Sequence, residues 1–205
     1  MLRLMVFIDG SNLYHESDRF SKGLRIDFSK FREELSGGFD LIRTFYYASM
    51  PANPTADQAG FFKKLGYLGY KTRIKPLRET MINGRRETRE KGIDVALATD
   101  LVAYGMRHAF DWALIVSGDQ DFCDAIEQVQ SQGLRVEVVF YRHAMAEELK
   151  LRADRYRYID DFADRITIGN TPLGEPRSDY HQRDRGFRTS SEVEHGAHPQ
   201  PESEE

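Results

Sequence analysis

Aspartates follow two apolar runs of this sequence at the points where the runs end. The first run lies within residues 2–8 and leads directly into Asp9, and the second lies within residues 111–117 and leads into Asp119 and Asp121. An ionised carboxylate next to a buried apolar strand is costly unless it is hydrogen-bonded or bound to a cation. These three side chains are therefore candidates for binding a positively charged group.

A fourth acid, Asp94, belongs to the segment KGIDVALATDL. The apolar residues that follow it have helical spacing, so Asp94 falls in the first turn of a helix, where the helix dipole favours a negative charge. Each acid also has a purely structural interpretation. Asp94 can complement the dipole, Asp121 can cap the next helix, and Asp9 can form a polar turn with Gly10.

Strand patterns alternate with helix patterns along most of the chain. Ser11 or Asn12 is the expected cap of the first helix, and Asn53 is the expected cap of the third. Strands are predicted at residues 2–8, 40–48, 70–76, 111–117, 134–140 and 156–159, and helices at 12–20, 28–35, 54–68, 93–107, 122–132 and 146–151. This alternation is typical of an α/β fold in which a parallel sheet lies between helices.

The carboxyl ends of parallel strands meet at one edge of a sheet, and ligands bind there. Asp9, Asp94, Asp119 and Asp121 would then converge, and a hard divalent cation such as Mg²⁺ would relieve their mutual repulsion. Such a site suits metal-assisted phosphodiester hydrolysis, and it equally suits a metal site used only for binding. Asp100 is rotated by about 240° from Asp94 on the helix, so we expect it to be structural or to lie behind the metal ligands.

The composition describes an ordinary globular domain followed by a polar tail. From Gly169 to the end there are eight acids and four Lys/Arg, which leaves 25 of each among residues 1–168, so the domain is neutral. Residues 169–205 lack apolar periodicity, and we expect a disordered tail. The single cysteine excludes an intrachain disulfide, and no apolar run has the length of a signal peptide or a membrane span. A cytoplasmic protein without membrane contact is expected.

Three motifs, in this order, resemble those of the NYN domain, a family in the PIN-like nuclease superfamily. They are FIDGSNLY, KGIDVALATDL and ALIVSGDQDF. The resemblance covers residues 2–162 and is closest to the bacterial single-domain branch. It implies that residues 1–168 form a PIN-like three-layer sandwich, with a central, mainly parallel sheet of about five strands between helices.

The resemblance also implies a site and an activity. Asn12 and Ser117 match polar family positions that orient the site. The implied activity is endonucleolytic cleavage, most often of RNA. The implied ligands of Mg²⁺ or Mn²⁺ are Asp9, Asp94, Asp119 and Asp121.

A basic segment, residues 70–91, directly precedes Asp94. It contains eight Lys/Arg and three Glu, so its net charge is +5 within a neutral domain. Contact with nucleic-acid phosphates is one interpretation, and an edge strand protected by charged side chains is the other. The tyrosines at 46, 47 and 70 can stack on bases, although we expect at least two of them to be buried. The candidate phosphate contacts are Lys71, Arg73, Lys75, Arg85, Arg86 and Lys91.

The main hypothesis is therefore a divalent-metal-dependent endoribonuclease. The alternative is a non-catalytic regulatory module that binds RNA, a nucleotide or a protein through a PIN-like fold. An aspartyl phosphatase is a weaker third hypothesis, because that chemistry usually requires an acid two residues after the first, where this sequence has Ser11. The sequence leaves open a homodimer and a protein partner for the tail.

Overall fold

The computed structural model describes residues 1–82, 85–89 and 92–169, with the backbone alone for 78–82 and 85–89. The predicted turn at Asn83-Gly84, the predicted phosphate contact Lys91 and all of the predicted tail beyond Gly169 lie outside the described residues. The boundary between a domain at 1–168 and a tail at 169–205 accordingly stays a prediction. None of the described helices combines the length and the apolar character needed to cross a bilayer.

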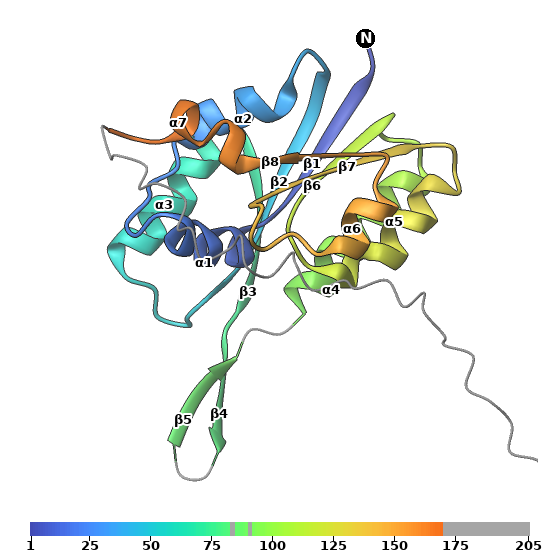
Figure 1. The fold of residues 1–205 in the computed structure, drawn as a ribbon. Coiled ribbons are helices and arrows are strands. Elements are labelled where there is room, and N and C mark those ends of the chain that lie inside the picture. The colour runs from blue at the N-terminus through green and yellow to red at the C-terminus, as the bar shows by residue number, and fades with distance from the viewer. Residues whose placement is uncertain (83–84, 90–91, 170–205) are drawn as a thin grey trace, which may run out of the picture. The chain divides into compact units, whose positions relative to one another are not determined.

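Six parallel strands form one sheet in the order β3-β2-β1-β6-β7-β8 (Figure 1). This confirms the predicted α/β class, and the edge strand β8 brings the sheet to six strands where about five were expected. The strands are β1 (Arg3–Asp9), β2 (Asp40–Met50), β3 (Tyr70–Pro76), β6 (Trp112–Val116), β7 (Arg135–Phe140) and β8 (Arg155–Tyr158).

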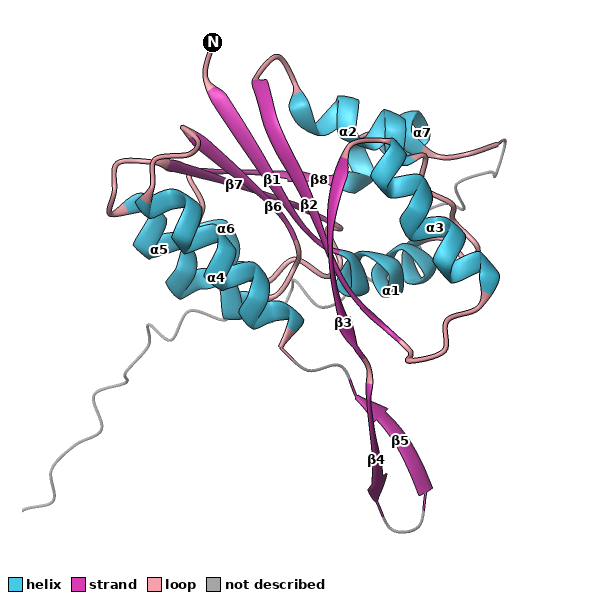
Figure 2. Cartoon of the chain, turned by 180° about the vertical axis from the view of Figure 1, so that it is seen from behind, coloured by secondary structure: helices cyan, strands magenta, loops and turns pink. Residues whose placement is uncertain are grey.

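Helices cover both faces of the sheet, which completes the three-layer sandwich (Figure 2). One layer contains α1 (Gly10–Phe20), α2 (Phe28–Ser36), α3 (Ala56–Tyr67) and α7 (Ala163–Ile166). The other contains α4 (Ile93–Met106), α5 (Cys123–Gln130) and α6 (Glu147–Arg152), and short 3₁₀ turns occur at η1 (Gln120–Phe122) and η2 (Ile159–Asp161). The site therefore has to lie at a rim of the sheet, since both of its faces are covered.

The core explains why β1 is apolar at consecutive positions. In β1, Leu4 through Ile8 are each at most 1% exposed, because β1 is paired on both edges and packed on both faces. Phe7 stacks on Phe45 of β2 at a centroid distance of 5.6 Å and meets Phe110 edge-on at 6.1 Å. A central strand of a parallel sheet requires this continuous apolar pattern.

The third helix begins at a different residue from the one predicted. Thr55, and not Asn53, is the cap: its hydroxyl accepts from the Gln58 backbone N–H at 3.2 Å, and the Gln58 side chain accepts from the Thr55 N–H at 3.0 Å. Both residues of this reciprocal capping box are in the sequence, three positions apart. The prediction was wrong because it gave Pro54 priority over the box.

A two-stranded antiparallel hairpin, β4 (Arg78–Ile82) and β5 (Arg85–Arg89), pairs with itself and not with the six-stranded sheet. It extends away from the sheet in both views (Figures 1 and 2). The sequence predicted only the turn between these strands, because Arg, Glu and Thr give no clear apolar alternation. The hairpin connects the edge strand β3 to α4.

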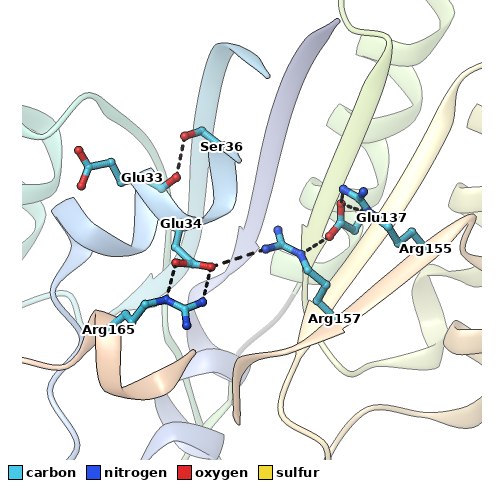
Figure 3. A network of polar contacts seen from close by, with 7 residues as sticks. All are labelled: Glu33, Glu34, Ser36, Glu137, Arg155, Arg157 and Arg165. Carbon is cyan, nitrogen blue, oxygen red and sulfur yellow. Dashed lines mark hydrogen bonds and ion pairs between the residues drawn. The ribbon is translucent and has the colours of Figure 1, made fainter. Parts of the chain in front are cut away.

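A network of charges joins the last part of the domain to the sheet (Figure 3). Glu137 of β7 is only 2% exposed, and it accepts hydrogen bonds from Arg155 and Arg157 of β8. Arg157 also approaches Glu34 of α2 at 3.9 Å, and Glu34 accepts two hydrogen bonds from Arg165 of α7, at 2.8 and 3.0 Å. The buried carboxylate is thus paired, as burial of a charge requires.

The Glu34–Arg165 pair predicts a specific pH dependence of stability. The hydrogen bond from Arg165 holds the pKa of Glu34 below its usual 4.5. A carboxylate with a depressed pKa stabilises the fold above its unfolded pKa and loses that contribution as the pH falls through its folded pKa. Arg165→Met should therefore cost only a little stability at neutral pH, because the pair is partly exposed, and progressively less as the pH falls below 4.5.

Urea denaturation at a series of pH values measures this effect. Arg25→Met removes the same charge from an exposed position, and the difference between the two variants isolates the ion pair. A cost for Arg165→Met that stayed constant from neutral to acidic pH would show that the loss comes from packing alone.

Candidate functional site

Asp9 ends β1 and caps α1. Its Oδ1 accepts from the backbone N–H of Asn12 at 3.1 Å, and the residue is 8% exposed. Ser11 and Asn12 were the predicted caps, but the carboxylate one turn earlier performs this role, because the helix starts directly at Gly10. The side chain of Asp9 is therefore oriented by the N-terminus of α1, whose dipole attracts a negative charge.

The second oxygen of Asp9 links β1 to β6, its neighbour in the sheet. Ser117, fully buried just beyond β6, donates from Oγ to Asp9 Oδ2 at 3.3 Å. The same Oγ accepts from the Asp119 N–H at 3.3 Å, and Asp119 Oδ1 accepts from the Asp121 N–H at 3.0 Å. Ser117 thus links the carboxylate of Asp9 at the end of β1 to the backbone of Asp119 just after β6.

This arrangement corrects one structural interpretation. Asp121 was a candidate cap for the helix after β6, but Asp119 caps η1, and Asp121 lies in the first turn with an exposed side chain. The carboxylate of Asp121 therefore makes no capping bond and faces solvent.

Asp94 and Asp121 line one pocket of about 640 Å³ between α4 and the segment after β6. Asp94 lies in the first turn of α4, as predicted, and no side chain caps that helix. The pocket also contains acids that the sequence did not single out, together with a half-buried thiol whose pKa is raised by burial. The other lining residues are Val95, Ala98, Gln120, Phe122, Cys123, Asp124, Glu148 and Arg152.

The four predicted ligands therefore occur as two pairs. Asp9 and Asp119 bond to the same serine, whereas Asp94 and Asp121 line the same pocket. Within residues 1–82, 85–89 and 92–169, no three His, Cys, Asp or Glu side chains come close enough to hold one metal ion. A single cage made by all four carboxylates is not seen in this part of the chain.

An aromatic side chain packs under the Asp9 turn. Tyr46 is 4% exposed, and its hydroxyl donates to the Gly10 carbonyl at 3.4 Å. Burial, reinforced by the charge of Asp9, raises the pKa of Tyr46 well above its usual range. A Cβ on Gly10 would lie 2.3 Å from the Tyr46 ring, so this turn requires glycine. Tyr46 is thus a neutral packing residue, as are the buried Tyr47 and Tyr70.

Asp100 of α4 does not line the pocket that contains Asp94, and it contacts side chains of β2 and β3 instead. Tyr47 donates to Asp100 Oδ2 at 2.9 Å, and the Arg73 guanidinium approaches the same oxygen at 3.2 Å. Burial, followed by the charge of Asp100, raises the pKa of Tyr47, so its hydroxyl remains a donor. Asp100 holds α4 against the edge of the sheet.

The basic residues of β3 differ in what they contact. Lys71 is exposed. Arg73 pairs with Asp100, and Lys75 donates to the Gly92 carbonyl at 2.6 Å. Gly92 directly precedes α4, so Lys75 fixes the start of the helix that contains Asp94. The side chains of Arg85 and Arg86 lie outside the described atoms.

A model of the NYN domain matches residues 3–160. The chain belongs to the NYN domain family. This family is part of the PIN-like nucleases, as the three motifs predicted.

Two further proteins resemble this NYN domain. The "Low amplitude and bright protein LabA" of Synechococcus elongatus is 29% identical over 180 residues, covering 85% of this chain and 91% of its own. A crystal structure of a Vibrio parahaemolyticus protein of unknown function superposes with a TM-score of 0.66 at 20% identity, covering 82% of this chain and 96% of that one. The second likeness shows the fold.

The donor atoms of this NYN site fit a hard divalent cation. Carboxylate oxygens are the ligands that Mg²⁺ and Mn²⁺ prefer, and Mg²⁺ commonly uses only one or two of them, with water and phosphate completing the shell. The amide oxygen of Asn12 is buried and has no hydrogen-bond partner among the described atoms. A cation or one of its waters beside Asp9 would satisfy that oxygen.

Some residues of the NYN site could not be recognised from the sequence. A Cβ on Gly118 would lie 2.0 Å from the Ala144 carbonyl oxygen, and the Gly118 carbonyl accepts from Ala146 N–H at 3.1 Å. The turn after β7 therefore packs directly on the loop that holds Asp119. Asp124 lines the pocket and could be suspected from the sequence only because it lies one helical turn after Asp121. Glu148 of α6 also lines the pocket, but nothing near it in the sequence indicates a site.

Proposed function

We propose that this NYN domain is a divalent-metal-dependent endoribonuclease. The observation that supports the proposal most is the series of hydrogen bonds from the Asp9 carboxylate through the Ser117 hydroxyl to the backbone N–H of Asp119, which holds two aspartates together at the ends of two adjacent central strands. Ligand sites of parallel α/β sheets occur at such strand ends. Membership of the PIN-like nucleases supports RNA phosphodiester cleavage as the reaction.

The carboxylates of the site would have different roles in binding the metal ions. Asp9, oriented by Ser117, and Asp119, oriented by the Asp121 N–H, would hold Mg²⁺ or Mn²⁺. Asp94 and Asp121 would hold an ion or its waters from the pocket. A bound ion supplies Lewis acidity and lowers the pKa of a water molecule. The exposed carboxylates of Asp94 and Asp121 can be reached from solvent, as an entering phosphodiester requires.

A binding module is the second candidate. It is favoured by one observation: no three acidic, His or Cys side chains of the described residues meet at metal-binding distance. In that case the acids would be the remnant of a metal site, and the domain would bind RNA, a nucleotide or a protein partner without cutting RNA. Asp100, Arg73 and Lys75 would serve the same structural role in either case.

Incubation of the purified full-length protein with mixed-sequence single-stranded RNA separates the two candidates. A nuclease should cut the RNA internally in Mn²⁺ or Mg²⁺ and leave 5′-phosphate ends, and it should show no cleavage in EDTA. Mn²⁺ should also raise the Tm, because an ion that binds only the native state stabilises it. RNA that is bound yet stays intact with every divalent ion would favour the binding module.

A further inference from the structure

The hairpin β4–β5, called the arm below (residues 78–82 and 85–89), is a free-standing ribbon. Its two strands pair with each other over five positions each and with no strand of the main sheet. The arm extends away from the sheet (Figures 1 and 2), and five paired positions make it roughly 14 Å long. A two-stranded ribbon alone is marginally stable in water, so a partner that covers it would order it.

The charge of the arm indicates what that partner is. Its described residues include four Arg and two Glu, a net charge of +2, whereas residues 1–168 as a whole are neutral. The register sets Arg78 directly opposite Arg89. Like charges in facing positions of a ladder destabilise it, and a polyanion lying on the ribbon would remove that repulsion.

The register also gathers the arginines. Because ladder positions alternate between faces, Arg78, Arg85 and Arg89 occupy positions of one face, and Glu87 is the acid among the residues of that face. A second copy of the arm would repel this face, since it is positive too. A phosphate backbone is attracted to it and needs no particular base sequence.

The base of the arm lies next to the acidic site. Three residues before Arg78, Lys75 donates to the carbonyl of Gly92, which lies three residues after Arg89, at 2.6 Å. This bond joins the two ends of the arm. Gly92 has φ +76°, a conformation that favours glycine, and Asp94 follows two residues later. The arm therefore leaves the domain beside the first turn of α4.

We propose that the arm binds the phosphate backbone of the RNA strand where that strand leaves the acidic site. The proposal rests on the proposed function for its substrate, and it adds a second contact surface outside the pocket. It commits to a single RNA strand bound without sequence preference. Pairing of the arm with a second copy of the chain is the alternative that the test has to detect.

The test measures RNA binding in the full-length Asp119→Asn protein, so that it does not depend on cleavage. The arm variant adds Arg78→Ser, Arg85→Ser and Arg89→Ser. The control variant instead adds Arg25→Ser, Arg43→Ser and Arg107→Ser, three exposed arginines elsewhere on the domain. Fluorescence anisotropy with a labelled single-stranded RNA of about 20 nucleotides gives Kd at several salt concentrations.

The arm variant should bind about tenfold or more weakly at low salt, and its salt slope should fall by about 2, since three phosphate contacts are lost. The control should bind like its parent. Equal affinity and slope in the arm variant and its parent would overturn the proposal, and so would an equal loss in the control. Light scattering detects the alternative, because a dimer that only the arm variant converts to monomer, with RNA affinity unchanged, assigns the arm to self-association.

These measurements distinguish failure of the arm proposal from failure of the nuclease proposal. If the wild-type protein cuts no RNA but the arm variant loses binding, the arm inference stands and the nuclease proposal falls. If the wild-type protein cuts RNA and the arm variant binds RNA as tightly as its Asp119→Asn parent, the nuclease proposal stands and the arm inference falls.

Discussion

Asp119→Asn is expected to lower metal-dependent RNA cleavage by about 100-fold or more while leaving the fold intact. The loss follows because the variant neutralises the carboxylate of Asp119, whose backbone N–H binds the same Ser117 hydroxyl that donates to Asp9. Electrostatic contacts at a reacting centre are commonly worth that much. The fold should survive because Asn caps helices as well as Asp does, so its Oδ1 can still accept from the Asp121 N–H.

Cleavage rates and thermal denaturation, each with and without Mn²⁺, measure both parts of this expectation. The Tm of the variant should match the wild type in EDTA but rise less when Mn²⁺ is added. Asp57→Asn, at an exposed acid in the first turn of α3, is the matched control. An Asp119→Asn protein that cut at the wild-type rate would show that the cleavage does not come from this site.

Gly118→Ala is expected to destabilise the domain more than an alanine at any other described glycine. The added Cβ would lie 2.0 Å from the Ala144 carbonyl oxygen and 2.6 Å from the Phe140 ring, and a backbone atom cannot move aside cheaply. Overpacking of this kind costs about 3 kcal/mol, which lowers the Tm of a domain of this size by roughly 6–12 °C. Any relaxation must displace the loop between Ser117 and Asp119, so cleavage should fall as well.

Gly66→Ala provides the control for this prediction, because no atom lies within 4 Å of the added Cβ and the residue is inside α3. That variant should be as stable as the wild type or slightly more stable, since Ala is the better helix former. Differential scanning calorimetry measures the Tm of both variants and of the wild type. A Gly118→Ala protein with an unchanged Tm would mean that the turn after β7 does not press on this loop.

The sequence predicted the layered fold and the strand ends correctly because both depend on local periodicity. The apolar run of β1 and the acid that follows it are adjacent in the chain, so Asp9 could be placed at a strand end from its neighbours alone. Asp94 was placed in the first turn of α4 for the same reason. The roles of these acids as metal ligands stay predictions.

Contacts between distant segments could not be predicted. The requirement for glycine at 118 depends on Ala144, which approaches only when β7 pairs with β6. Alternation made Lys75 a candidate phosphate contact, which stays a prediction, but alternation could not indicate that Lys75 donates to Gly92 across the base of the hairpin. The cap of α1 was assigned to Ser11 or Asn12 since both are good caps, but the helix starts two or three residues earlier, at Gly10, directly after β1. Side-chain partners, unlike periodicity, depend on the tertiary arrangement.

The position of β1 in the middle of the sheet has a consequence during synthesis of the chain. β1 emerges from the ribosome first, but one of its two neighbours is β6, with Leu4 paired to Trp112. At about 5–20 residues per second, the unpaired edge of β1 waits roughly 5–20 s for that partner. Asp9 also lacks its hydrogen bond from Ser117 during this interval, so the acidic site forms only after β6 has been synthesised.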